Sequence, residues 1–311
     1  MLKQISFLIL CAVAIVLFTA PVQACTSAVV SGKVTPDGRP LLWKNRDTDF
    51  MRNHIDYVKG EKYNFIAVVN SANAYLKEAW MGTNSSGFAL MNTQSYNLVD
   101  VKGDEERGAA NGRVIYRALE VCATVEDFCH FLDTISKPSD IEANFGVIDA
   151  QGGAAMFEVD YHKYVMYDAN NPKDAPYGYI ARTNFSFAGK VNEGAGYVRY
   201  MEADQVLMKA SATGSITPQF IFNDLSRSFR NRMLDIDLRS GAYNRPQASG
   251  WFVDQDFIPR SSTSCSVVVQ GVKPGEKAEL TTMWTLLGYP PTGIVVPLWV
   301  KDAGKLLPGM V

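Results

Sequence analysis

The chain has 311 residues, of which 47% are hydrophobic and 20% are charged, an ordinary globular composition that is sufficient for a large core. Thirty Lys and Arg residues stand against 32 Asp and Glu residues, so the formal net charge is −2. Because no basic tract or block of like charge occurs, the sequence argues against nucleic acid as a partner.

The first 24 residues have the features of a cleavable secretory signal peptide. Lys3 supplies a positive start, and residues 5–18 form an almost unbroken apolar run. Val22 and Ala24 then place small residues at positions −3 and −1 of a cut before Cys25. The apolar run is short for a membrane span of about 20 residues, which makes a retained anchor the weaker alternative. We expect a secreted or periplasmic protein that has no membrane association after cleavage.

A hairpin opens the expected mature chain, which would form one domain over residues 25–311. Apolar runs at 26–30 and 41–43 flank the sequence Thr35-Pro36-Asp37-Gly38, which favours a turn. The hairpin places Cys25 at the edge of a sheet. Further strands are expected at 65–69, 88–91, 145–148, 154–159, 179–181, 265–269 and 294–299.

Helices are expected between these strands, mainly in the middle of the chain. One helical face is formed by Val114, Ile115, Ala118, Leu119 and Cys122. Thr124 has the character of an N-cap for a helix over 125–132, and Thr217 with Pro218 predicts the start of a helix that runs through Phe229. Because strands outnumber helices, we expect a layered α+β fold with packed sheets and helices outside.

The cysteines give no indication of a metal site. Cys11 leaves with the signal peptide, and the other four form no C-x-x-C pair or Cys/His cluster. Export permits a disulfide between Cys122 and Cys129, although two small buried residues in helices explain this pair equally well. We expect no metal and no cofactor.

Cleavage before Cys25 would give this residue two functional groups. The α-amine of a chain terminus has a reference pKa of about 7.7–8.0, so a large fraction is neutral near pH 7 and can accept the proton of the thiol. No histidine is needed in such a site. The three histidines, His54, His130 and His162, lie in no recognisable cysteine-protease signature.

Residues 25–49, CTSAVVSGKVTPDGRPLLWKNRDTD, resemble the opening of N-terminal-nucleophile hydrolases that use cysteine. More narrowly, the segment is similar to the linear amide C–N hydrolases, which include penicillin V acylases, conjugated bile salt (choloylglycine) hydrolases and isopenicillin-N acyltransferases. The hallmarks are the terminal cysteine, the hairpin and an Asn-x-Asp triplet, here Asn45-Arg46-Asp47. Later segments with similarity lie at 82–97, 144–160, 181–187, 194–207 and 262–269.

The resemblance implies a four-layer αββα sandwich and a hydrolase that forms a thioester on Cys25. It also implies that Asp47 holds the α-amine, that Asn92 and Asn184 donate hydrogen bonds to the oxyanion, and that Arg199 places positive charge near the site. Aromatic residues near the site segments favour a small-molecule amide substrate with an apolar acyl group. The expected substrate contacts are Lys44, Arg46, Phe50, Tyr96 and Phe185.

One position departs from the family pattern. Lys44 stands where bile salt hydrolases and penicillin V acylases usually carry an arginine. A lysine keeps the charge but lacks the planar fork of donors. This departure ranks general N-acyl amides above bile salts as substrates.

Several alternatives remain open at this point. N-terminal-cysteine dipeptidases share the Cys-Thr start, and acyl transfer could replace hydrolysis. A surface lipoprotein lipidated at Cys25 is the non-enzymatic alternative, but Gln23 fits a lipobox poorly and an apolar strand follows the cysteine at once. The sequence also leaves open whether the protein forms a homo-oligomer.

Overall fold

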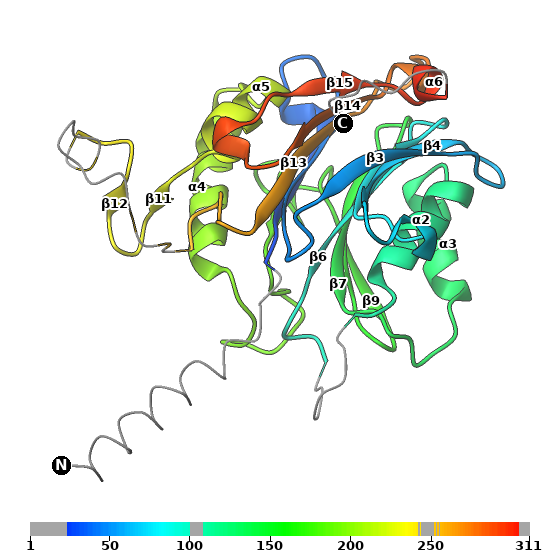
Figure 1. Cartoon of the computed structure of the whole chain (residues 1–311), viewed down its shortest axis with the longest axis horizontal. Coiled ribbons are helices and arrows are strands. Elements are labelled where there is room, and N and C mark those ends of the chain that lie inside the picture. The colour runs from blue at the N-terminus through cyan, green and yellow to red at the C-terminus, as the bar shows by residue number, and fades with distance from the viewer. Residues whose placement is uncertain are drawn as a thin grey trace, which may run out of the picture.

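Two antiparallel sheets lie face to face at the centre of the structure, and helices cover their outer faces (Figure 1). This computed structural model describes residues 24–99, 108–241, 243, 252, 254 and 256–304. The expected signal peptide, apart from Ala24, lies outside the described residues, as does Cys11.

The first sheet has six strands in the order β10-β1-β2-β13-β14-β15. Their bounds are β1 (Thr26–Val30), β2 (Leu41–Asp47), β10 (Tyr179–Arg182), β13 (Thr263–Gln270), β14 (Thr282–Leu287) and β15 (Val296–Leu298). β1 and β2 form the expected hairpin, in which Thr26 pairs with Asn45. β1 and β2 are both interior strands, and the start of β1 lies beside the end of β2. The expectation that Cys25 lies at the edge of a sheet is wrong, because β10 pairs with the outer side of β1.

The second sheet has seven strands in chain order, β3 to β9. Their bounds are β3 (Asn53–Val58), β4 (Phe65–Asn70), β5 (Met81–Asn84), β6 (Ala89–Gln94), β7 (Ala143–Ile148), β8 (Ala154–Val159) and β9 (Tyr164–Asp168). A separate two-stranded ribbon pairs β11 (Arg230–Asn231) with β12 (Ile236–Asp237).

The helices divide between the two outer faces. The longer ones are α2 (Asn111–Val121), α3 (Val125–Thr134) and α4 (Tyr197–Ala212). The short elements are α5 (Pro218–Phe220), α6 (Val300–Ala303), the π turn η3 (Ile221–Leu225), and the 3-10 turns η1 (Gly32–Val34), η2 (Ala74–Leu76), η4 (Ala278–Leu280) and η5 (Pro290–Thr292). Among the described residues, no helix combines the length and apolar character needed to cross a membrane.

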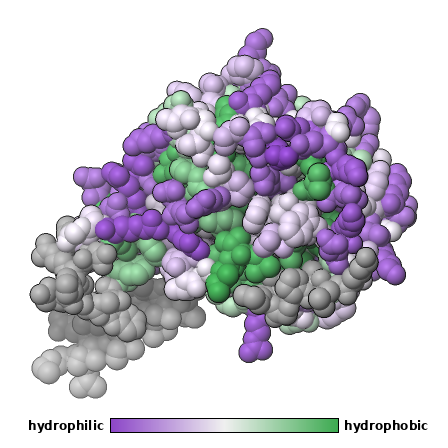
Figure 2. Space-filling view, turned by 90° about the horizontal axis from the view of Figure 1, so that it is seen from above, coloured by the Kyte–Doolittle hydropathy of each residue, from purple (hydrophilic) through white to green (hydrophobic). Residues whose placement is uncertain are grey.

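Three apolar layers hold the sandwich together. Val29 and Leu42 from one sheet pack between the sheets against residues such as Met91. α2 and α3 cover the seven-stranded sheet, and α4 covers the six-stranded sheet. Seen from above, the described surface is largely hydrophilic, with apolar patches gathered near its middle (Figure 2). The expected αββα sandwich is confirmed.

The local predictions hold where the sequence signal is strong. Every expected strand overlaps an observed one, and Thr124 caps α3 through a capping box. The prediction of a helix through Phe229 is wrong, because the helical backbone ends at Leu225. The next residue, Ser226, turns inward, and its hydroxyl bonds Asn45 and Ser266 of the sheet instead of continuing the helix.

Cys122 and Cys129 are free thiols, so they form no disulfide.

Strands 53–58, 81–84, 164–168 and 282–287 were not predicted. The first and third of these are only half-buried, and the second contains a glycine within a run of four residues. Such segments lack the continuous apolar run that identifies a buried strand.

Candidate active site

The backbone of Cys25 is held on both sides by buried polar side chains. Its N–H donates to Oδ1 of Asn184 at 3.0 Å, and its carbonyl oxygen accepts from Nη1 of Arg199 at 2.7 Å. Nη2 of Arg199 donates to the same Oδ1 of Asn184 at 2.9 Å. Cys25 itself is only 6% exposed, and Ala24 before it is fully buried. The three residues thus form a closed set of contacts around the start of β1.

The thiol of Cys25 lies near the cationic end of β2. Sγ approaches the backbone oxygen of Asp47 at 3.8 Å, a weak S–H contact. Because Thr26 pairs with Asn45, the residue before Thr26 lies beside Arg46. Side chains alternate between the two faces of a strand, so Lys44 and Arg46 project to the same face of the sheet. A thiolate at Cys25 would therefore lie near two positive charges.

Lys44 links the two sheets. Its Nζ donates to Oδ1 of Asn92 on β6 at 2.9 Å and to the backbone oxygen of Trp80 at 3.0 Å. Burial lowers the pKa of Lys44 from 10.5 to about 8; nearby Cys25 opposes the shift and Arg46 reinforces it. Because Oδ1 of Asn92 accepts from Lys44, the orientation of this amide is fixed. No described residue accepts from its Nδ2, which leaves that group able to donate to a substrate.

Arg46 is held inside the protein by neutral partners. Its guanidinium donates to Oδ1 of Asn53 and, at 2.8 Å, to Oδ1 of Asn70. It also lies over the ring of Trp80, 4.7 Å from the centroid. Burial lowers its pKa. Within the described part of the chain, neither Arg46 nor Lys44 has a carboxylate at ion-pair distance, so the positive potential at this end of the site is not neutralised by a direct partner.

Asp47 is a buried carboxylate with one unused oxygen. Oδ1 accepts from Oγ1 of Thr263 at 2.5 Å, whereas Oδ2 has no hydrogen-bond partner among the described residues. Burial raises the pKa of Asp47 from 3.8 to about 7, and Arg199 is the largest of the influences that oppose this shift. With Ala24 still attached to Cys25, the Asp47 carboxylate makes no hydrogen bond with the Cys25 nitrogen. The expected contact is therefore not formed in this state of the chain.

Asn184 uses both ends of its amide within the protein. Oδ1 accepts from Cys25 and Arg199, and Nδ2 donates to the backbone oxygen of Gln94 at 2.9 Å. The Nδ2 group carries two N–H bonds, and the contact with Gln94 uses one of them. Oδ1 of Asn184 therefore orients the Cys25 nitrogen, and the oxyanion role that the resemblance implied stays a prediction.

Sequence patterns do not identify the residues that hold the site side chains in place. Nε of Arg199 donates to Oδ1 of Asp256 at 2.8 Å, and Asp256 adopts a left-handed φ of 59°. Nδ2 of Asn144 contacts the backbone oxygens of Thr183 and Phe185, each at 3.2 Å, on either side of Asn184. Asn144 begins the 144–160 segment, but only the tertiary contact identifies its role.

The expected substrate contacts fall into different environments. Phe50 is 42% exposed and Tyr96 is half-buried. Phe185 is buried and stacks on Tyr197 at the start of α4, with ring centroids 4.2 Å apart. Its ring therefore contributes to the packing of α4. Lys44 and Arg46 are buried beside Cys25, and both are engaged by protein groups.

The chain matches one protein family. Residues 34–211 match the family described as acyl-coenzyme A:6-aminopenicillanic acid acyl-transferase. No curated protein matches the sequence. The matched range contains four of the five expected catalytic residues, Asp47, Asn92, Asn184 and Arg199, while Cys25 precedes it.

Solved structures with a similar fold share little sequence with this chain. A variant of conjugated bile acid hydrolase from Clostridium perfringens has 13% identity and a TM-score of 0.52, over 92% of this chain and 95% of that one. Penicillin V acylase from Agrobacterium tumefaciens has 15% identity and a TM-score of 0.45, over 89% and 86%. An N-acylethanolamine-hydrolyzing acid amidase orthologue from Caenorhabditis elegans has 15% identity and a TM-score of 0.43, over 65% and 89%. The first of these supports the shared fold.

Proposed function

The chain belongs to the acyl-coenzyme A:6-aminopenicillanic acid acyl-transferase family, and from this premise we propose that it is an exported N-terminal-cysteine hydrolase of linear amides. The proposed nucleophile is the thiol of Cys25, and removal of residues 1–24 would free its amine. The substrate class is an N-acyl amino acid or penicillin V type of amide with an apolar acyl group. The observation that carries the proposal is the pair of hydrogen bonds on the Cys25 backbone. Its nitrogen donates to Asn184, and its oxygen accepts from Arg199.

These two hydrogen bonds suit a residue that acts as its own base. After cleavage, the amine would keep one N–H on Oδ1 of Asn184, which leaves its lone pair for the thiol proton. The thiolate attacks the amide carbonyl, and the protonated amine then gives its proton to the leaving nitrogen. The products of this half-reaction are a free amine and a thioester on Cys25. Water adds to the thioester in the second half-reaction, releasing the acid and restoring the thiol.

Asp47 gains a partner in this scheme. Its Oδ2 is buried without a hydrogen bond while Ala24 is attached to Cys25. A buried carboxylate oxygen without a partner is costly, and a cation formed nearby would stabilise its ionised form. We propose that the α-ammonium formed after cleavage supplies this charge, which would lower the pKa of Asp47.

Asn92 is the proposed oxyanion donor. Lys44 holds its Oδ1, and its Nδ2 has no acceptor within the described chain. The fixed orientation matters because preorganised donors lose little on reaching the transition state. The positive charges of Lys44 and Arg46 would add to the stabilisation of the thiolate and of the oxyanion. We assign Asn184 and Arg199 to holding the backbone of Cys25 instead.

Acyl transfer is the second candidate, and the family description favours it. In that case an amine replaces water as the acceptor of the acyl group. Export would favour water, because activated acyl thioesters are scarce outside the cell. Dipeptide hydrolysis and lipidation of Cys25 remain the other outcomes to test.

One experiment separates these candidates. The exported protein is analysed by intact mass, and it is then incubated with N-acyl amino acids, penicillin V, conjugated bile salts and dipeptides. We expect a mass that begins at Cys25 without lipid, release of the amine from an acyl amide, and a thioester on Cys25 after acid quenching. A lipidated terminus, or cleavage of dipeptides alone, would contradict the proposal. Formation of new amides with an added amine would identify a transferase.

A further inference from the structure

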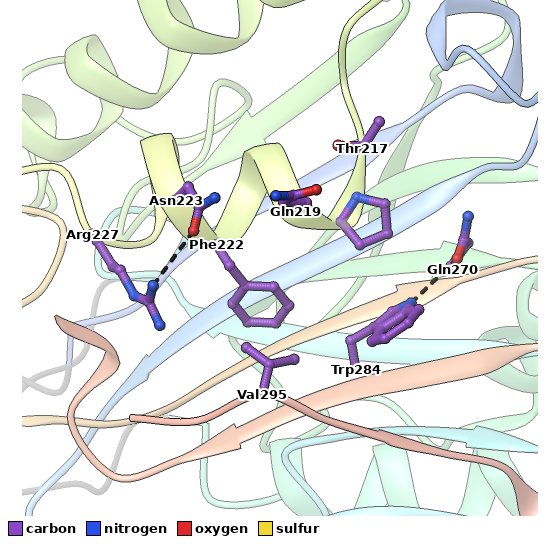
Figure 3. Close-up of a pocket in the computed structure, with 9 residues that line it drawn as sticks. Thr217, Gln219, Phe222, Asn223, Arg227, Gln270, Trp284 and Val295 are labelled. Carbon is purple, nitrogen blue, oxygen red and sulfur yellow. Dashed lines mark hydrogen bonds between the residues drawn. The ribbon is translucent and has the colours of Figure 1, made fainter. Parts of the chain in front are cut away.

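A cavity lies on the outer face of the six-stranded sheet, under α5 and η3 (Figure 3). Its volume is about 480 Å³, within the range of small-molecule sites. Gln270, the last residue of β13, lines the cavity. Cys265, near the first residue of the same strand, pairs with Arg46 beside the Cys25 site. Five residues of strand separate these ends by roughly 17 Å. The cavity is therefore distinct from the Cys25 site.

One part of this cavity is apolar. Phe222 from η3, Trp284 from β14, and Val295 project into it from different elements (Figure 3). Nε1 of Trp284 donates to Oε1 of Gln270 at 3.2 Å, so the polar atom of the indole is already satisfied. The remaining surface of the indole is suited to an aliphatic chain or an aromatic ring.

Arg227 provides a fixed positive charge at the other end of the cavity, beside Asn223 (Figure 3). Its Nε donates to the backbone oxygen of Pro290 at 2.7 Å, and Nη2 donates to that of Gly293 at 3.1 Å. Nη1 has only a long contact of 3.5 Å to Oδ1 of Asn223. No described carboxylate lies at ion-pair distance from this guanidinium. Its orientation is thus set by neutral groups, and its charge has no direct partner.

The other charged side chains near the cavity do not neutralise Arg227. Arg239 donates to the backbone oxygen of Arg227 at 2.9 Å, but its side chain is exposed and does not line the cavity. At the Gln270 end, Asp37 accepts from Gln270 at 2.7 Å and is paired with Arg39 at 3.2 Å. The cavity therefore offers an unpaired cation beside an apolar surface.

We propose that this cavity binds a small amphipathic carboxylate, with its carboxylate on Arg227 and its apolar part against Phe222, Trp284 and Val295. Arginine matches a carboxylate through its planar fork of donors. The acid released by the proposed hydrolysis belongs to this chemical class. The binding site itself does not depend on that reaction, since it shares no residue with the Cys25 site.

The test uses phenylacetate as the probe and phenylacetamide as its neutral counterpart. Methyl-labelled mature protein is titrated with each, and the resonances of Val295 are followed by NMR. We expect saturable shifts at Val295 with the acid and at least about tenfold weaker binding of the amide, because a charge-assisted hydrogen bond contributes about 1.5–3 kcal/mol. Equal binding of acid and amide would overturn the proposal. So would shifts confined to inner-face methyls such as Val267, or no shift at all.

Two variants test the two ends of the cavity separately. Arg227→Gln should remove the preference for the acid, and the matched control Arg239→Gln should keep it, since Arg239 is exposed and does not line this cavity. Arg227 also supports two backbone oxygens, so Val295→Phe provides a second variant that fills the cavity without touching the charge. It should abolish phenylacetate binding, measured by isothermal titration calorimetry because the Val295 resonances are lost in this variant, while amide hydrolysis at Cys25 continues. Unchanged binding in Val295→Phe would place the probe elsewhere and overturn the assignment.

Discussion

The N–H of Cys25 donates to Oδ1 of Asn184 at 3.0 Å, although the two residues are 159 positions apart in the chain. β10 pairs with β1, which brings Arg182 opposite Ser27 and carries the following residues past Cys25. Arg199 then donates to Cys25 O and to Asn184 Oδ1, which fixes the geometry from α4. The contact concerns the backbone nitrogen of Cys25, and this nitrogen is the group that cleavage would convert into an amine.

The first prediction concerns the two functional groups of Cys25. Cys25→Ala should abolish turnover and acyl-enzyme formation, because no thiol remains. A mature protein extended by one alanine before Cys25 should lose about 10²–10⁴ in kcat, since an amide nitrogen cannot accept the thiol proton. Intact mass must show that the extension is retained during the assay. Full activity of an extended, untrimmed protein would contradict catalysis by the α-amine.

The second prediction concerns Asn184. Asn184→Leu keeps the side-chain size but removes the acceptor for the Cys25 nitrogen. We expect kcat to fall by about 10²–10³, within the range measured for loss of a positioned polar group in an active site, with little change in KM. Asn92→Leu removes the proposed oxyanion donor and should give a similar loss. The two variants should differ in the pH dependence of kcat/KM, because only Asn184 contacts the amine. Identical pH profiles would argue that both residues serve the oxyanion.

The third prediction uses the buried position of Lys44. Its pKa is lowered to about 8 by burial, so the side chain is cationic below pH 8 and neutral above it. The titratable groups that influence its pKa are Cys25, Arg46, Cys265 and Asp47. If the cation stabilises the thiolate and oxyanion, kcat should fall as the pH rises through about 8. In Lys44→Arg, the fall in kcat should occur at a higher pH, because arginine stays protonated. An unchanged fall in Lys44→Arg would assign the titration to another group.

The fourth prediction concerns the stability contributed by Asp47. Burial raises its pKa to about 7 in the folded state while Ala24 precedes Cys25, so the folded chain binds a proton that the unfolded chain releases near pH 4. The stabilising contribution is full below pH 4 and is lost as the pH rises towards 7.

Urea unfolding of the uncleaved protein at pH 4, 5.5 and 7 should show this decline, and Asp47→Asn should weaken it. In the mature protein the decline should be smaller, because the α-ammonium would favour ionised Asp47. The same slope in wild type and Asp47→Asn would exclude Asp47 as its source.

The fifth prediction concerns the acyl group. Each methylene buried in an apolar pocket contributes about 0.8 kcal/mol. Lengthening the acyl chain of an N-acyl amino acid should therefore raise kcat/KM by roughly threefold to fourfold per methylene until the pocket is filled. A homologous series measured beside glycine- and taurine-conjugated bile salts checks this. A flat profile, with dipeptides cleaved faster than every acyl amide, would favour a dipeptidase.

Local sequence signals predicted much of the fold. The Pro36-Asp37-Gly38 turn, the cap at Thr124 and the apolar strand runs act over a few residues, and the structure bears them out. β2 was expected only to Trp43, because polar residues follow. It continues through Asp47, fully buried, since Lys44, Asn45, Arg46 and Asp47 each find a polar partner on another element.

By itself, the sequence determined the layered α+β class and, by resemblance, the family and the residues gathered around Cys25. The tertiary structure decided which atoms meet. It directed the Asn184 oxygen to the Cys25 nitrogen, placed Lys44 on Asn92 across the two sheets, and left Oδ2 of Asp47 without a partner. Turns, caps and strand periodicity depend on neighbours in the chain, so a short stretch of sequence is enough to predict them. Hydrogen bonds between residues 48 to 174 positions apart depend on strand register and sheet stacking, which only the folded chain fixes.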